Sequence, residues 1–198
     1  MQLMMTTAPR SKVVIHNTVS SLKTADFTNI TVFCEPDSVE PDCQVIQNQT
    51  TLGAYTNWRR ALSYACDNCT DWFGIVQDDL IVKPVLRNVL SNLYPDHVYS
   101  PYLSTVHHRS EIQGWFQVEA GFGLCGALFF CMHVDVAKQL FEVMPTCVPE
   151  NKHIDGYLSL ALEKLNIALF CHSPTLVKHL GDGCSTLGYM SNRQEWGW

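Results

Sequence analysis

The chain has 198 residues, of which 46% are hydrophobic and 16% are charged. A chain of this length buries roughly 70% of its unfolded surface, so one folded domain over residues 1–198 is expected. It contains no charge block or low-complexity run, so the composition excludes disorder beyond the termini. The formal net charge of −6 gives no general attraction to nucleic acid or to an anionic membrane, and a DNA partner would need a local basic patch such as Arg59-Arg60 or His107-His108-Arg109.

The first third of the chain predicts a β-α-β unit. Short apolar runs at 3–6 and 30–33 favour strands, with a polar helix around 19–25 between them, and such units are parallel and right-handed. Residues 35–51 are rich in acids, amides and prolines, which indicates a long irregular loop. In 53–65 the apolar residues then recur at helical spacing, which predicts a helix facing a core.

A buried strand at 72–76 follows, and it leads into the acids Asp78 and Asp79. Residues 80–82 continue extended, and a helix is expected from Lys83-Pro84 to Leu93, because proline is tolerated in the first turn of a helix. Open α/β sheets bind ligands at the carboxyl ends of their strands. The two acids are therefore candidates for a binding site.

The second half of the chain predicts more strands than helices. Strands are expected at 97–103, 115–118, 127–131, 167–171 and 175–177, with helices at 135–143 and 154–165. Strands alternate with helices early and crowd together later, and the last two strands are expected to close the sheet. The fold class is therefore α/β, with a mixed, mainly parallel sheet flanked by helices.

Adjacent carboxylates at a sheet edge suit a divalent cation. Carboxylate oxygens prefer Mg²⁺ or Mn²⁺, and such sites leave positions open for substrate phosphates. His179, near the C-terminus, offers an imidazole that could complete the site. Two other interpretations stay open: Asp78 and Asp79 cap the following helix or end a strand, and His179 is a structural residue.

The nine cysteines are odd in number and most lie inside apolar runs, which is typical of buried free thiols. Cys66 and Cys69 have the spacing of a zinc or redox pair, but no second pair follows. No apolar stretch approaches the ~18 residues of a membrane span, and the N-terminus lacks the pattern of a signal peptide. We expect a reduced protein of the cytoplasm, or of the host cytoplasm if the protein is viral.

Four segments resemble one family of enzymes. They are MTTAPR at 5–10, LGAYTNWRRAL at 52–62, QDD at 77–79, and Ile154-Asp155 followed by SPTLVKHLG at 173–181 with Ser185-Thr186. Their order and spacing resemble those of small GT-A glycosyltransferases of bacterial and phage type. The last segment is similar to the Pro-Ser-Leu-X-Gln-His-X-Gly-X-X-Ser-Ser pattern of N-acetylglucosaminyltransferase IV-like enzymes. One departure is Gln77, where the family often has an acid.

The resemblance implies a GT-A-like fold and transfer of a hexosyl or N-acetylhexosaminyl group from a nucleotide-sugar, expected to be a UDP-sugar, to an acceptor hydroxyl. Asp79 and His179 would hold Mn²⁺ or Mg²⁺ against the donor diphosphate, and Asp78 would contact ribose or sugar hydroxyls. Further roles in binding the donor are implied for Thr7, Pro9, Arg10, Asn57, Arg60, Gly181, Gly183 and Ser185.

Asp155 is the candidate general base, with Glu119 as the reserve. A base here would take the proton of the acceptor hydroxyl as that oxygen attacks the anomeric carbon opposite the leaving group, which gives inversion. An acid in the first turn of a helix is also favoured by the helix dipole, so a structural role for Asp155 stays open. Trp115, Phe116 and Phe122 are candidates for a platform that stacks on the acceptor sugar, or else they pack in the core.

Two other functions fit the same residues. The acceptor could be a modified base in DNA, as in phage enzymes, instead of a glycan or a small molecule. The chain could also be a sugar-nucleotide or glycan-binding module with decayed catalytic residues, which Gln77 leaves open.

Overall fold

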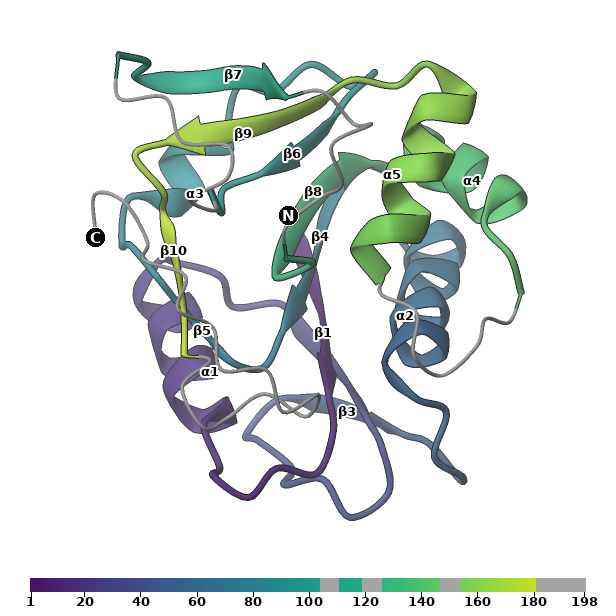
Figure 1. Cartoon of the computed structure of the whole chain (residues 1–198). Helices are drawn as coiled ribbons and strands as arrows, with labels where there is room; N and C mark the ends of the chain where they lie inside the picture. Colours follow the sequence, from purple (N-terminus) through teal and green to yellow (C-terminus); the bar gives the residue numbers. More distant parts are fainter. Residues whose placement is uncertain (104–110, 119–125, 147–153, 181–198) are drawn as a thin grey trace.

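The computed structural model describes residues 1–103, 111–118, 126–146 and 154–180 (Figure 1). The elements in chain order are β1 (Gln2–Thr7), α1 (Ile15–Thr24), β2 (Ile30–Cys34), β3 (Gln44–Gln47), α2 (Ala54–Asn68), β4 (Trp72–Gln77), β5 (Leu80–Val82), α3 (Leu86–Val89), β6 (Val98–Ser100), β7 (Gly114–Val118), β8 (Phe129–His133), α4 (Val134–Val143), α5 (Ile154–Leu165), β9 (Leu169–Ser173) and β10 (Val177–His179). Across these described residues, no helix combines the length and the hydrophobicity that a membrane span requires.

Eight of the strands form one sheet, in the order β3-β2-β1-β4-β8-β6-β9-β7. The first four run parallel to one another, β8 is antiparallel to both of its neighbours, β9 is parallel to β6, and β7 is antiparallel to β9. Strands β5 and β10 pair antiparallel in a separate two-stranded sheet. The prediction of a mixed, mainly parallel sheet is confirmed.

The helices cover both faces of this sheet. Figure 1 shows α2, α4 and α5 together on one side and α1 on the other. Each face has its own apolar cluster: Met4 of β1 packs in the cluster of α2, α4 and α5, while Leu3 and Met5 pack in the cluster of α1. Successive side chains of a strand point to opposite faces. Central strands buried on both faces are therefore continuous apolar runs, and β1, β2, β4 and β8 have this pattern.

Three predictions about elements are wrong. The expected loop at 35–51 contains β3, a four-residue edge strand with polar, exposed ends. The expected helix to Leu93 is only the four residues of α3, and the Ser91 hydroxyl donates to the carbonyl of Asn88 at 2.7 Å, a local bond that competes with a longer helix. Residues 175–177 do not close the main sheet. The chain leaves the main sheet at Pro174, which has no N–H for a ladder, and β10 pairs with β5 instead.

The cysteines of the described residues are free thiols. Cys34, Cys131 and Cys171 are buried, as expected for small apolar side chains, while Cys66 and Cys69 at the end of α2 are half-buried.

Candidate active site

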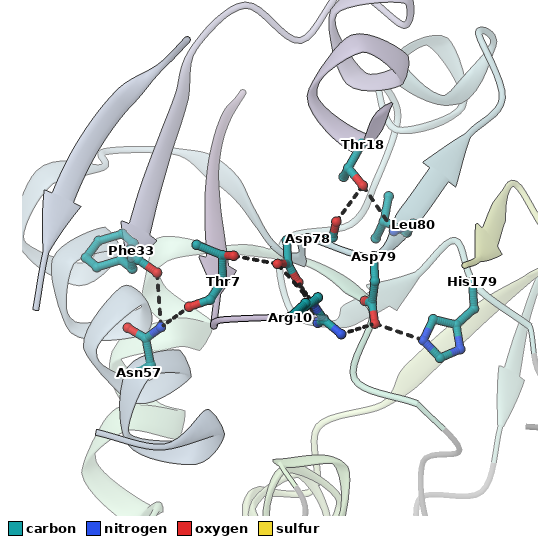
Figure 2. Close-up of polar contacts among 9 residues, drawn as sticks. All are labelled: Thr7, Arg10, Thr18, Phe33, Asn57, Asp78, Asp79, Leu80 and His179. Carbon is teal, nitrogen blue, oxygen red and sulfur yellow. Dashed lines mark hydrogen bonds and ion pairs between the residues drawn. The ribbon is translucent and has the colours of Figure 1, made fainter. Parts of the chain in front are cut away.

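The site lies where β1 and β4 end. The two strands are parallel neighbours, and Thr6 pairs with Gln77, so the residues after them meet at the same edge of the sheet. The Thr7 hydroxyl donates to Oδ2 of Asp78 at 2.5 Å (Figure 2). Asp78 and Asp79 are each only 2% exposed. The structure therefore brings a pair of buried carboxylates to the carboxyl edge of the parallel strands, where ligands bind in open α/β sheets.

Arg10 bridges the two carboxylates. Its Nη2 lies 2.5 Å from Oδ1 of Asp78, its Nε donates to both oxygens of Asp78 at 3.0 and 3.1 Å, and its Nη1 lies 3.1 Å from Oδ2 of Asp79. A guanidinium presents its donors as a planar fork, which suits this arrangement. When both acids are ionised and the imidazole of His179 is neutral, two carboxylates and one guanidinium leave one net negative charge in a buried place. The edge is thus electrostatically prepared for a further cation.

The two acids differ in their ionisation. Burial raises the pKa of Asp78, and the hydrogen bond and charge of Arg10 only partly offset it. Burial would also raise the pKa of Asp79, but the hydrogen bond from His179 and the charge of Arg10 outweigh it, so the pKa of Asp79 is lowered. Asp79 is therefore the acid of the pair whose ionised form is more favoured, and an ionised carboxylate is what a hard metal ion requires.

His179 reaches the acids through the small second sheet. Strand β5 begins directly after Asp79, and its first residue, Leu80, pairs with His179 of β10. The N–H of Leu180 donates to the carbonyl of Asp79 at 2.7 Å, and Nε2 of His179 lies 3.2 Å from Oδ2 of Asp79. Side chains alternate along a strand, so a slip of one residue in this register would turn the imidazole away from the carboxylate.

The donor set fits a divalent cation that also binds its substrate. Oδ1 of Asp79 is buried and has no hydrogen-bond partner. Within 1–103, 111–118, 126–146 and 154–180, no three His, Cys, Asp or Glu side chains gather as a metal cluster. Asp79 and His179 could therefore supply two ligands, and the others would come from bound phosphates and water, as is usual for Mg²⁺. An orphaned carboxylate oxygen in a native protein calls for such a partner.

Asn57 lies at the same edge, but its hydrogen bonds are to the protein. Its Nδ2 donates to the carbonyl of Phe33 at 3.0 Å and to that of Thr7 at 3.4 Å, so it ties the ends of β1 and β2 together. Its Oδ1 accepts from Nδ2 of Asn48 at 3.0 Å, and Arg60 in turn donates to Oδ1 of Asn48. These contacts place both predicted donor-binding residues of α2 beside the ends of the parallel strands.

Glu35 is a polar residue of this edge that the sequence analysis did not single out. It directly follows β2 and is 2% exposed. Its Oε2 accepts from the N–H of Leu52 at 2.9 Å, whereas Oε1 is buried and has no hydrogen-bond partner. The available signal was an acid directly after an apolar strand, the same signal that identified Asp78.

Asp155 lies in the first turn of α5 and accepts two backbone hydrogen bonds. Its Oδ2 accepts from the N–H of Gly126 at 3.1 Å, and its Oδ1 accepts from the N–H of Gly156 at 3.0 Å. Gly126 closely precedes β8, the neighbour of β4 in the sheet. Asp155 therefore joins the start of α5 to the segment that enters the sheet beside the acids.

The remaining predicted residues have separate outcomes. Trp115 and Phe116 lie on β7, and three strands separate β7 from β4. The ring of Trp115 makes edge contacts with Tyr99 and His172, each with centroids 5.1 Å apart, and Phe116 packs against the opposite apolar cluster, so both pack against the protein. Pro9 is exposed in the segment that follows β1. The others lie outside the described residues: Glu119, Phe122, Gly181, Gly183 and Ser185.

No protein-family model and no curated protein sequence matches this chain. A solved structure that is similar is GalNAc-T7 with UDP, GalNAc and Mn²⁺, with a TM-score of 0.61 over 90% of this chain at 9% sequence identity. This chain spans less than half of that protein, 43% of its length. At such an identity the likeness concerns the fold alone, and the chain therefore has a GT-A-like fold.

Proposed function

We propose that this chain is a metal-dependent glycosyltransferase that moves a hexosyl or N-acetylhexosaminyl group from a UDP-sugar to an acceptor hydroxyl. The observation that carries the proposal is the buried, unpartnered Oδ1 of Asp79, in a carboxylate whose other oxygen lies 3.2 Å from Nε2 of His179. The similar fold of a protein crystallised with UDP, GalNAc and Mn²⁺ supports the same reading. The bacterial or phage type of the enzyme and its likeness to N-acetylglucosaminyltransferase IV-like enzymes belong to this proposal too, on the sequence motifs alone.

The residues of the edge have distinct roles in this proposal. Asp79 and His179 would hold the cation in place of the hydrogen bond that joins Nε2 of His179 to Oδ2 of Asp79, and the cation would supply positive charge beside the leaving nucleoside diphosphate. Arg10 holds both acids through its guanidinium and adds positive charge beside the donor phosphates, and Asp78 is the proposed contact to hydroxyls of the donor. Glu35, with one carboxylate oxygen that has no partner, accepts from an N–H or O–H of the nucleoside. Thr7, Asn57 and Arg60 hold the strand ends that form the floor of the site.

Asp155 is the proposed base of the transfer. Its carboxylate would take the proton of the acceptor hydroxyl while that oxygen attacks the anomeric carbon, with inversion of configuration. Glu119 remains the reserve candidate. The acceptor is proposed to be a glycan or a small molecule. The formal net charge of −6 counts against a DNA acceptor. Of the two local basic patches that DNA could use, Arg59 lies over the ring of Phe141 at 3.9 Å and Arg60 donates to Asn48, while His107-His108-Arg109 lies outside the described residues.

Calorimetric titration with UDP, with and without Mn²⁺, tests the donor site. We expect metal-dependent binding that Asp79→Ala and His179→Ala each abolish. Asp96→Asn, a change at an exposed acid outside the site, is the control and should bind as the parent does. No UDP binding by the parent with any divalent metal would refute the proposal.

Turnover is measured on the same samples as slow hydrolysis of a panel of UDP-sugars. Asp155→Asn should keep UDP binding and lose turnover. Binding that is accompanied by no hydrolysis or transfer in the parent would instead identify a binding module without catalysis.

A further inference from the structure

Thr18, in the middle of α1, bonds the turn that carries the two acids. Its Oγ1 donates to the carbonyl of Asp78 at 2.7 Å and accepts from the N–H of Leu80 at 3.2 Å (Figure 2). A threonine hydroxyl inside a helix ordinarily bonds a carbonyl one turn earlier in the same helix. Here it is fully buried, at 0% exposure, and serves another segment as both donor and acceptor.

The turn needs such partners because it connects two different sheets. Its backbone leaves β4 at Gln77, whose N–H donates to the carbonyl of Leu128 at 2.9 Å. Further along, the carbonyl of Asp79 accepts from the N–H of Leu180 at 2.7 Å. Buried backbone groups that lack a partner are costly, and Thr18 serves one carbonyl and one N–H between these two anchors. Three elements of the fold thus hold the turn: the segment before β8, the end of β10, and α1.

Ser21 extends this contact by one helical turn. Its hydroxyl donates to the carbonyl of Thr18 at 2.9 Å and accepts from the N–H of Val82 at 3.3 Å. Helix α1 therefore presents two hydroxyls, three residues apart on one face, to the backbone of β5 and of the turn before it. The register of β5 against α1 is fixed by these bonds.

We infer that Thr18 is a positioning residue for the metal-binding carboxylate. By holding the backbone on both sides of Asp79, it keeps that side chain turned toward His179. This inference rests on the proposed function for its consequence in binding, although the contacts that carry it are independent of any ligand. Groups that orient metal ligands typically change metal affinity by about 10- to 100-fold when they are removed.

Thr18→Val removes the hydroxyl and keeps the branched shape, while Thr18→Ser keeps the hydroxyl. We expect affinity for UDP in the presence of Mn²⁺ to fall about tenfold in Thr18→Val and to stay near the parent value in Thr18→Ser. The matched control is Thr31→Val: Thr31 is also 0% exposed, and its hydroxyl bonds the side chains of Gln2 and Gln44, away from the acids. If Thr18→Val does not fold, Thr18→Ala takes its place with the same expectation.

Amide hydrogen exchange of the metal-free protein provides a readout that needs no ligand. In Thr18→Val the amides of Leu80 and Leu180 should exchange at least about tenfold faster. The amide of Leu80 loses its acceptor, the Thr18 hydroxyl, and the amide of Leu180 donates to the carbonyl of Asp79 in the loosened turn. In Thr31→Val both should exchange as in the parent.

The outcomes separate the two proposals. Unchanged exchange at both amides in Thr18→Val would overturn the positioning role, as would an equal loss of UDP affinity in Thr18→Val and Thr31→Val. A parent protein that binds no UDP would refute the proposed function, and the exchange rates would then decide the role of Thr18 by themselves.

Discussion

Replacing Arg10 by methionine tests the charge balance of the site. The Arg10 side chain is 9% exposed and those of Asp78 and Asp79 are each 3% exposed, so the change leaves two buried carboxylates without their guanidinium. Removing one partner of a buried ion pair costs about 3 to 5 kcal/mol, because the remaining charge is buried and unpaired. Taking the lower figure, about 3 kcal/mol, the midpoint of thermal unfolding should fall by roughly 6 to 12 °C in a chain of this length.

The free energy of unfolding is measured by urea denaturation in EDTA for the parent, Arg10→Met, and the double variant Arg10→Met/Asp78→Asn. The double variant should regain about 1 to 3 kcal/mol, since it removes one of the two repelling charges. When Mn²⁺ replaces EDTA, it should stabilise Arg10→Met more than the parent, because the guanidinium no longer competes with the cation for Asp79. A ligand that binds only the folded state stabilises it according to its affinity.

A destabilisation of Arg10→Met below about 1 kcal/mol would refute this reasoning, because it would place the pair in the range of an exposed salt bridge. Equal stabilisation of parent and variant by Mn²⁺ would show that the guanidinium and a cation do not compete for Asp79.

Three further predictions concern the core, the thiols and the metal. Gly74→Ala places a Cβ within 2.8 Å of two side chains and should lower the free energy of unfolding by about 1 to 3 kcal/mol. In Gly156→Ala the new Cβ meets nothing within 4 Å, so this overpacking should not occur. Urea denaturation measures the free energy of unfolding of both variants. Burial raises the pKa of Cys171 to about 12, so iodoacetamide at pH 8 should modify the half-buried Cys43 long before Cys171. Mass spectrometry of the native protein measures the order of labelling, and early labelling of Cys171 would contradict the prediction. Chelation by EDTA should weaken UDP binding at least about tenfold, measured by calorimetry, and an affinity that is the same in EDTA and in Mn²⁺ would contradict a cation bridge.

The central strands were predictable from the sequence because both of their faces are buried. Runs such as 72–76 are apolar throughout, and only a strand or a short buried helix fits them. Strand β3 was not predictable in this way: it lies at the sheet edge, where Val45 and Ile46 are only partly buried and the flanking residues are polar and exposed. Edge strands are commonly short and polar, so they lack the signal of the core.

The candidate site was predictable in its residue types and less so in its contacts. The strand end identified Asp78 and Asp79, and the C-terminal motif identified His179, which the structure places against Asp79. The pairing of β10 with β5 was missed, because it depends on two short segments that no local pattern connects. The contacts of Arg10 were missed for a similar reason. The sequence predicted that Arg10 binds the donor, but its ion pairs with both acids depend on the path of the chain after β1.

The pairing of β5 with β10 also determines when the site can form during synthesis. Asp79 and His179 are 100 residues apart in the chain, and closing a loop of that length costs about 4 kcal/mol in chain entropy. Such contacts form late, after local ones have been made. A ribosome-bound chain that ends before residue 177 lacks β10, so β1, β2 and β4 can assemble while the proposed metal site remains incomplete. In the proposed function, cation binding would therefore report that β10 has been made and has docked against β5.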